Sequence, residues 1–357
     1  MKEQNLIDPV QTARLQRLGV RPEATQLLDD ADIIDLHIDT FIPIRLWGHD
    51  ILRDHGHGPM RGRFFGHLDL PRMQLSGLTG AMWSLTTNPF RSKQSRWRIF
   101  QKNLEHFQRL VAQSQGKLRL ARDLGEYRAA KAAGAQGVFL SIQGGNALQD
   151  ATQVVDYLKS SSIVRVTLVH LTDSIFGASS SPLSLNRRTG LSHHGHEFVQ
   201  QLNAAKVFVD LAHIRHKPFW DAVAVHDRSQ PLIATHTGVS GVRMHWRNLD
   251  DAQLKAIAAT GGVIGIIFAA NFLKRQGGPR DLDMVIEHLE HICRVVGEEF
   301  AAIGSDYDGA IVPPADLRDG LGYARLVQRM FDLRWPEAKI RAIVGGNALR
   351  AIGLLRP

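Results

Sequence analysis

Eight short apolar runs recur along the chain, and most are followed by a stretch with helical periodicity. The runs cover residues 33–37, 80–85, 137–142, 163–170, 207–211, 231–235, 262–268 and 300–305. Continuous apolar strands that alternate with helices are typical of a parallel sheet covered on both faces. Eight such units in 357 residues predict an α/β fold of the (β/α)8 TIM-barrel type. A dinucleotide-binding sheet is disfavoured, because no Gly-x-Gly-x-x-Gly follows the first run.

The segments between the runs predict the helices of this barrel. In residues 92–115 the apolar side chains recur at helical spacing. The other expected helices are 123–133, 150–159, 193–205, 218–228, 250–259, 281–297, 323–333 and 336–355, the last with a break at Gly346-Asn347. Several open with Asp or Ser at an N-cap position. No linker divides the chain, so we predict one barrel domain over residues 1–357, with a helical extension over residues 1–31.

Two long inserts interrupt this alternation of apolar runs and helical segments, at residues 42–77 and 171–190. Both follow strands, so we expect them at the carboxyl ends of the barrel strands, where the βα loops lie. The first insert contains four histidines, at positions 49, 55, 57 and 67. These histidines are either additional metal ligands or ordinary loop residues, and the sequence leaves both possibilities open.

The amino-acid composition narrows the cellular compartment and the kinds of binding partner that we expect for the protein. One cysteine excludes an internal disulfide framework, and no stretch approaches 18 uninterrupted apolar residues, so no membrane span is expected. The N-terminus lacks the apolar core of a secretory signal, which makes a cytoplasmic protein the expectation. The net charge of +8 raises the possibility of nucleic-acid binding, but the 43 Lys and Arg residues are scattered. We therefore expect a small-molecule substrate and no nucleic-acid partner.

Polar residues suited to metal binding or proton transfer lie at or near the ends of six of the eight runs. These residues are His37 and Asp39, Gln143, His170, His213, His236 and Asp306. In a parallel barrel the carboxyl ends of all strands surround one pocket. Each residue alone is explained by an ordinary structural hydrogen bond. Together they predict a metal site, and His and carboxylate ligands favour a zinc-type ion.

The chain also resembles the renal (membrane) dipeptidase family of zinc peptidases, a branch of the amidohydrolase-like barrels. The resemblance extends from about residue 32 to the C-terminus. It rests on DLHIDT (35–40), HLDLPRMQLSGLTGAMWS (67–84), IQGGNAL (142–148), VTLVHLTDS (166–174), FVDLAHI (208–214), IATHTGV (233–239), RNLDDAQLKAIAATGGVIGI (247–266), IGSDYDG (303–309) and GGNALRAI (345–352).

The resemblance implies a role for each site residue. His37 and Asp39 match ligands of a first metal, and His213 and His236 match ligands of a second. Asp306 matches the catalytic acid/base, while His170 matches the histidine that polarises the substrate carbonyl. Arg247 matches the arginine that holds the substrate carboxylate. The family resemblance thus implies zinc-dependent hydrolysis of a dipeptide or similar small amide, and a homodimer.

Gln143 departs from the family pattern, in which a glutamate at this position bridges the two metals. Two dications about 3.5 Å apart repel by roughly 19 kcal/mol at an effective dielectric of 20, so a lost carboxylate charge weakens the pair. One hypothesis is a hydrolase with one or two zinc ions. The alternative is a barrel with a mono- or non-metal site, acting as a non-peptidase pathway protein on a peptide-derived metabolite.

Overall fold

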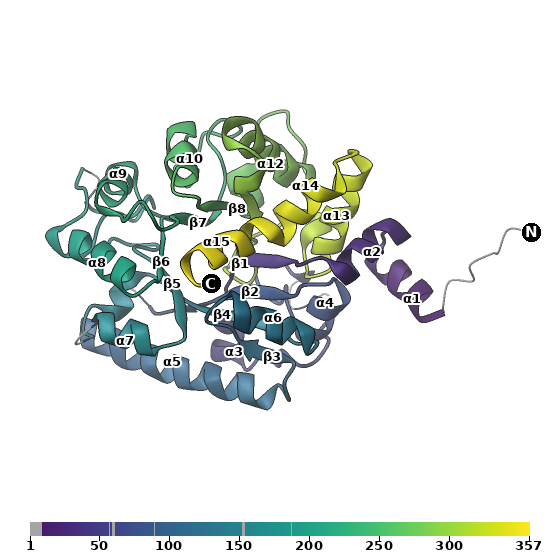
Figure 1. Ribbon diagram of the computed structural model, residues 1–357, viewed down its shortest axis with the longest axis horizontal. Coiled ribbons are helices and arrows are strands. Elements are labelled where there is room, and N and C mark those ends of the chain that lie inside the picture. Colours follow the sequence, from purple (N-terminus) through teal and green to yellow (C-terminus); the bar gives the residue numbers. More distant parts are fainter. Residues whose placement is uncertain (1–8, 57, 59–60, 89, 152–153, 187) are drawn as a thin grey trace, which may run out of the picture.

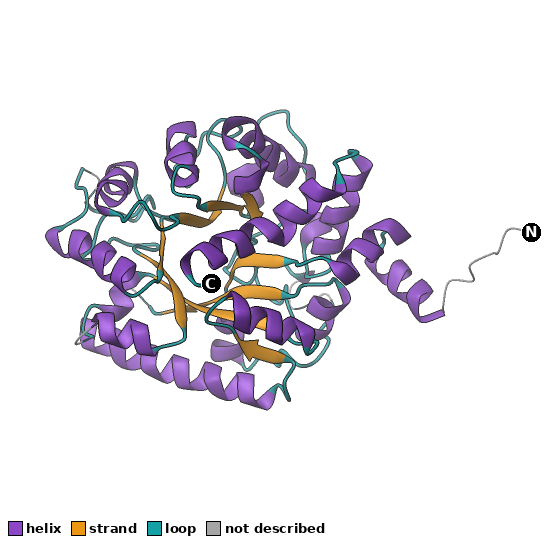
Figure 2. Cartoon of the chain, in the orientation of Figure 1, coloured by secondary structure: helices purple, strands orange, loops and turns teal. Residues whose placement is uncertain are grey.

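The computed structural model describes residues 9–56, 58, 61–88, 90–151, 154–186 and 188–357. Eight parallel strands form a closed barrel, because β2 pairs with both β1 and β4. The strands are β1 (Ile34–Ile38), β2 (Gly80–Thr86), β4 (Gln136–Gln143), β5 (Ile163–Thr167), β6 (Phe208–Asp210), β7 (Ile233–Thr237), β8 (Val263–Ile266) and β9 (Ala301–Ile303). The predicted (β/α)8 barrel is confirmed, and the helices surround the ring of strands (Figure 2).

One strand was not predicted. The three-residue β3 (Leu118–Leu120) lies outside the barrel and pairs with the first residues of β4. Only one of its residues, Leu118, is fully buried. A strand this short carries too few apolar positions to show a period-2 pattern in the sequence.

The helices predicted between the strands are present, with ends shifted by a few residues. They are α5 (Lys93–Gln113), α6 (Leu124–Ala132), α7 (Val154–Ser160), α8 (His193–Ala204), α9 (His216–Val225), α10 (Asp251–Ala258) and α12 (Asp283–Val296). A short α11 (Ala270–Leu273) and the 3-10 helices Gly145–Leu148, Glu298–Phe300 and Ala315–Leu317 complete these connections. Three expected N-caps are formed by Ser92, Asp123 and Asp250, whose side chains accept backbone N–H groups of the first turn, and Ser192 caps α8 in the same way. The helix expected to open at Asp281 instead has Leu282 as its N-cap, without a side-chain hydrogen bond.

Two helices precede the barrel, where a helical extension was expected. They are α1 (Pro9–Leu18) and α2 (Pro22–Asp30), while residues 1–8 of the predicted extension lie outside the described residues. The insert after β1 contains α3 (Phe41–Trp47) and α4 (Leu70–Leu75). Within the described residues, no helix combines the length and apolar character that crossing a bilayer requires.

The C-terminal segment contains α13 (Gly322–Asp332), α14 (Glu337–Arg341) and α15 (Asn347–Leu355). The break expected at Gly346-Asn347 was wrong, because the π-helical turn Ala342–Gly346 leads directly into α15. The surroundings of Gly345 explain why this turn contains a glycine at that position. A Cβ there would lie 2.0 Å from the carbonyl oxygen of Asp32, so the turn packs directly on the backbone that leads into β1.

The barrel interior is closed at the amino ends of its strands by α15, which lies across the ring in Figure 1. Apolar residues at or near the beginnings of the strands, such as Ile34, Phe208 and Ile233, form one cluster with Ala348 and Ile352 of α15. A second, larger core fills the space between the strands and the outer helices. Polar side chains are therefore left to the opposite end of the barrel.

Candidate functional site

The predicted site residues meet at the carboxyl ends of the strands. His37 lies on β1, Gln143 ends β4 and His236 lies on β7. The remaining residues, Asp39, His170, His213, Arg247 and Asp306, lie in the loops that follow the strands. A cavity of about 630 Å³ is lined by Asp39, Gln143, His170, His213, Arg247 and Asp306. His37 and His236 are fully buried next to it.

The backbone brings the first and last strands of the barrel together at this site. The N–H of Asp39 donates to the carbonyl of Tyr307 at 2.8 Å, and the N–H of Asp306 donates to the carbonyl of His37 at 3.0 Å. Asp306 and His213 both have a left-handed backbone, with φ of +62° and +63°. Non-glycine residues seldom adopt this conformation, and it is concentrated at functional sites.

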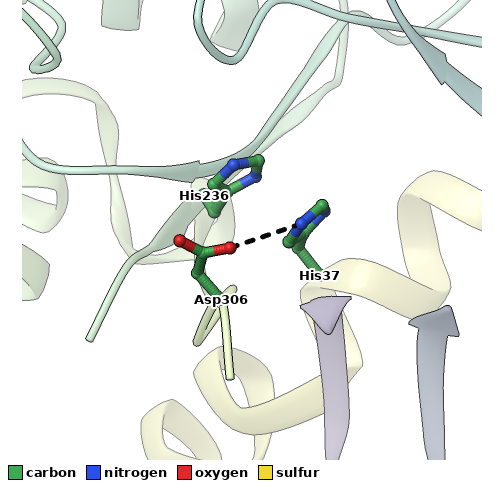
Figure 3. Close-up of side chains that lie close together, drawn as sticks. All are labelled: His37, His236 and Asp306. Atoms are coloured by element: carbon green, nitrogen blue, oxygen red, sulfur yellow. Dashed lines mark ion pairs between the residues drawn. The ribbon is translucent and has the colours of Figure 1, made fainter. Parts of the chain in front are cut away.

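Two histidines and two carboxylates form the centre of the site. Nε2 of His37 lies 3.5 Å from Oδ1 of Asp306 and 3.6 Å from Oδ2 of Asp39. The rings of His37 and His236 stack with centroids 3.8 Å apart. One ligand atom each of His37, His236 and Asp306 lies within 4.8 Å of the others (Figure 3).

His213 and Gln143 complete the cluster on the other side of His236. The Nε2 atoms of His213 and His236 are 2.8 Å apart. Nε2 of Gln143 lies 3.2 Å from Nε2 of His213 and 3.4 Å from Nε2 of His236. Two imidazole lone pairs at such a distance repel unless a proton or a cation lies between them, so this pair is suited to share one.

A buried hydrogen-bonded chain supports His236. The Thr235 hydroxyl lies 2.7 Å from Oδ2 of Asp210 and 2.9 Å from Nδ1 of His236. Its single proton goes to the carboxylate, which cannot donate. Nδ1 of His236 therefore donates to the hydroxyl oxygen, and Nε2 keeps its lone pair towards the site. Metal-binding histidines in proteins are usually held in this way.

A buried arginine, which sequence reasoning missed, contacts His37. Arg165 on β5 is fully buried, and its Nη2 lies 2.8 Å from Nδ1 of His37. The same guanidinium pairs with Asp210 at 2.9 Å. The signal in the sequence was a charged residue inside the apolar run IVRVTLV (163–169). A buried charge on a barrel strand requires a partner in the interior.

Burial shifts the pKa values of the side chains that face the cavity. Desolvation, reinforced by the nearby charge of Asp39, raises the pKa of Asp306 well above its usual range. Desolvation also lowers the pKa of His170 to about 4 and holds the pKa values of His213 and His236 well below the usual value. The three imidazoles are therefore neutral near pH 7, whereas Asp306 takes up a proton more readily than an exposed aspartate does.

Arg247 is a buried residue that lines the cavity. Its Nη2 donates to the carbonyl of His236 at 2.6 Å, while its Nε has no partner among the described residues. Desolvation lowers its pKa to about 10, so it remains a cation near pH 7. A buried guanidinium at the cavity wall suits recognition of a carboxylate.

Much of the cavity wall is apolar and aromatic, which sequence reasoning did not predict. The first insert contributes Ile42, Arg63, Phe64 and Phe65, the second contributes Leu171, and later segments contribute Trp246, Phe272 of α11, Ile311 and Val312. Aromatic residues in loops carry no periodic pattern, so no signal in the sequence assigned them to this wall.

Three histidines of the first insert, His49, His55 and His67, form hydrogen bonds with backbone groups. His67 donates through Nε2 to the carbonyl of Gly62 and accepts the N–H of Asp308 at Nδ1. His49 and His55 contact the carbonyls of Leu68 and Asp50. The possibility that these three are metal ligands loses support, and His57 lies outside the described residues.

Several buried polar atoms of the cluster lack a partner, as expected where an ion binds. Among the described side chains, these include Nε2 of His37, Oδ1 of Asp39, Oε1 of Gln143 and Nδ1 of His213. Buried polar groups are nearly always hydrogen-bonded, so several unpartnered atoms in one place indicate a ligand. Imidazole, carboxylate and amide donors fit zinc, although His37 is also engaged by Arg165.

The fold and the site together define a class of protein: a (β/α)8 barrel with a histidine–carboxylate cluster at the carboxyl ends of its strands. Within this class the chain matches one family, described as membrane dipeptidase (peptidase family M19), over residues 21–355. The chain belongs to this family, as its motifs predicted.

Two curated relatives are 28% identical to the chain. One is an uncharacterised protein in the pqqA 5′ region of Klebsiella pneumoniae, with 71% of this chain and 95% of that protein covered. The other is an uncharacterised protein in the PQQ-III 3′ region of Acinetobacter calcoaceticus, with 73% and 88% covered. Neither name states an activity.

Solved structures share the fold at lower identity. A metallopeptidase from Rhodobacter sphaeroides, liganded with a phosphinate mimic of the dipeptide L-Ala-D-Ala, is 23% identical with a TM-score of 0.80, covering 91% of this chain and 99% of that one. The probable dipeptidase PvdM from Pseudomonas aeruginosa is 17% identical with a TM-score of 0.81, covering 96% and 98%. At this identity the likeness establishes the fold alone.

Proposed function

We propose that the protein is a zinc-dependent hydrolase of a dipeptide or similar small amide. The observation that carries this proposal is the meeting of three groups over the histidine–carboxylate cluster in one cavity. Asp306 has a raised pKa, His170 is a neutral imidazole, and Arg247 is a buried cation at the cavity wall. Membership of the membrane dipeptidase family supports the same reaction class.

Each of these side chains has a task that its environment suits. Arg247 binds the terminal carboxylate of the substrate and fixes its orientation. His170 donates a hydrogen bond to the oxygen of the scissile carbonyl as negative charge develops on it. Asp306 takes a proton from the attacking water and delivers it to the leaving amine. When bound by the cluster, zinc would provide Lewis-acid activation of water and of the scissile carbonyl.

The cavity wall favours an apolar substrate. Its volume of about 630 Å³ lies in the usual range for small-ligand sites. Phe64, Phe65 and Trp246 face it from two loops, so we expect preference for a dipeptide with at least one apolar side chain. The dipeptide mimic in the Rhodobacter sphaeroides structure makes L,D dipeptides a necessary part of any substrate panel.

Asp306→Asn tests this function. The amide cannot take up the proton, so we expect turnover of the best dipeptide in an L,L and L,D panel to fall by roughly 10²- to 10⁴-fold, with the circular dichroism spectrum unchanged. Asp316→Asn is the matched control, because burial also raises the pKa of Asp316, which is not among the residues lining the cavity. An unchanged rate for Asp306→Asn would remove Asp306 from the mechanism.

The second candidate is a barrel that binds a peptide-derived metabolite without hydrolysing an amide. Two observations favour it: the neutral Gln143 at the centre of the cluster and the cationic Arg165 against His37. It predicts saturable binding of dipeptides by calorimetry without release of amino acids, with zinc present in excess. Zinc-dependent turnover of any dipeptide in the panel contradicts it.

A further inference from the structure

The contact between Arg165 and His37 determines which nitrogen of His37 carries its proton. All guanidinium nitrogens donate and none accepts. With Nη2 of Arg165 at 2.8 Å, Nδ1 of His37 therefore accepts, and the proton of the neutral imidazole lies on Nε2. Nε2 is the atom that faces Asp39 and Asp306. At the position of the first metal, His37 presents an N–H instead of a lone pair.

Arg165 is held in this contact from several strands. Its Nη1 donates to Oγ1 of Thr167 at 2.6 Å and to Oδ2 of Asp210 at 2.9 Å. Its Nη2 also donates to the hydroxyl of Ser141 on β4 at 2.8 Å. The residue is fully buried and has no solvent-facing rotamer available without loss of these bonds. The guanidinium is thus a fixed positive charge directly behind the first metal position.

His236 has the opposite arrangement. Its Nδ1 donates to Thr235, so its Nε2 lone pair faces the neighbouring Nε2 of His213 at 2.8 Å. The two halves of the cluster therefore differ: in one, a lone pair faces a second imidazole nitrogen, and in the other, an N–H has a guanidinium on the far side of its ring. Proximity of the ligand atoms alone does not reveal this difference.

We propose that Arg165 excludes a metal ion from the His37–Asp39 position, so that the site binds one ion, at His213 and His236. The Nε2–H of His37 then faces the carboxylates of Asp39 and Asp306, at 3.6 and 3.5 Å. The inference deepens the proposed hydrolase by stating the number of ions and their place, and it rests on the same site. It also reassigns His37 and Asp39 from metal ligands to positioning residues.

Zinc stoichiometry tests the proposal without reference to turnover. Full-length protein purified without chelator is analysed for zinc per chain and titrated with Zn²⁺ by calorimetry. We expect one zinc in the wild type and in Gln143→Glu, and two in Gln143→Glu/Arg165→Gln. Relative to Gln143→Glu, the double variant is expected to bind the second zinc at least 10-fold more tightly. In Arg165→Gln, Asp210 keeps the donors Ala212, Thr235 and Thr167.

Arg72→Gln is the matched control. Arg72 is also buried and paired with an aspartate, Asp69, but it does not line the cavity. Loss of a buried ion pair by itself therefore leaves the zinc count at one. A wild type with two zinc ions or none overturns the proposal, as does a folded double variant that binds only one.

A second measurement covers the case in which Arg165→Gln fails to fold. Nitrogen-15 NMR of histidine-labelled wild-type protein, with one equivalent of Zn²⁺, reports which ring nitrogen of His37 carries the proton. A proton on Nε2 supports the proposal, and a proton on Nδ1 overturns it. The proposed function fails separately: one zinc without any dipeptide turnover rejects the hydrolase but keeps this inference, whereas two zinc ions with turnover do the reverse.

Discussion

Thr235 connects the candidate site to the charged interior of the barrel. Its hydroxyl donates to Asp210 and accepts from His236, so one proton position determines the next along the chain. Asp210 in turn pairs with Arg165, which contacts His37. The two halves of the histidine cluster are therefore supported by one buried network in which each residue limits the proton position of its neighbour.

Removal of this hydroxyl is expected to weaken metal binding. In Thr235→Val, Nδ1 of His236 loses its acceptor, and we expect zinc affinity to fall about 10- to 100-fold when measured by competition with a chromogenic chelator. Thr25→Val is the control, because Thr25 is equally buried but bonds only to the carbonyl of Arg21, away from the site. Equal zinc affinity in both variants would contradict the role of Thr235.

At the residue scale, sequence reasoning found the side chains that lie at or just beyond strand ends. His37, His236 and Asp306 were identified because a parallel barrel brings all strand ends to one place. Arg165 and Asp210 were missed because they lie inside the predicted apolar runs 163–170 and 207–211, where side-chain direction follows from the register. The effect of Arg165 on His37 also depends on a contact between residues 128 positions apart, which no local pattern encodes.

At the scale of elements, Asp308 fixes the first insert to the end of β9. One carboxylate oxygen accepts the N–H groups of Gly66 and His67, and the other accepts the hydroxyl of Thr40. Burial alone would raise the pKa of Asp308, but the hydrogen bonds with His67 and Thr40 outweigh it and hold the pKa below its usual range. The loop that supplies Phe64 and Phe65 to the cavity wall is anchored at this point.

Asp308→Asn is therefore expected to lower the free energy of unfolding by about 1–3 kcal/mol, because an amide cannot satisfy all of these donors. A lowered folded-state pKa gives a contribution that is fully present above the unfolded-state pKa of about 3.9. It is lost as the pH falls through the folded-state value. Urea unfolding from pH 3 to 8 should show the difference from wild type to be constant above about pH 5 and to narrow in acid.

The control for this prediction is Asp156→Asn, which changes an exposed carboxylate on α7. We expect its free energy of unfolding to remain within about 0.5 kcal/mol of wild type. A difference between Asp308→Asn and wild type that grows as the pH falls would show that the sign of the pKa shift is wrong.

The elements themselves were largely predictable, and the exceptions have physical causes. The barrel strands lie in continuous apolar runs, as a parallel sheet requires. Strand β3 depends on pairing with the first residues of β4, which is a tertiary contact. The π-helical turn at Ala342–Gly346 depends on the approach of Gly345 to Asp32, so the glycines that suggested a break instead allow close packing.

At the scale of the whole molecule, α15 completes the inner core of the barrel. Ile352 is nearly fully buried among residues near the beginnings of the strands, whereas Leu354 on the same helix is 57% exposed. We expect Ile352→Ala to reduce the free energy of unfolding by about 2–5 kcal/mol, measured by denaturant titration. Leu354→Ala is the matched control and should change it by less than about 0.5 kcal/mol. Similar losses for both would show that α15 does not fill the barrel end.

Because α15 covers the amino end of the barrel, we expect substrate to enter the cavity, and product to leave it, between the loops at the carboxyl ends of the strands. The product is then expected to leave by the path along which the substrate entered. The aromatic side chains that line this passage, Phe65 and Trp246 among them, therefore meet the incoming molecule and the outgoing one alike. Substrate entry and product release are therefore expected to depend on the same loops.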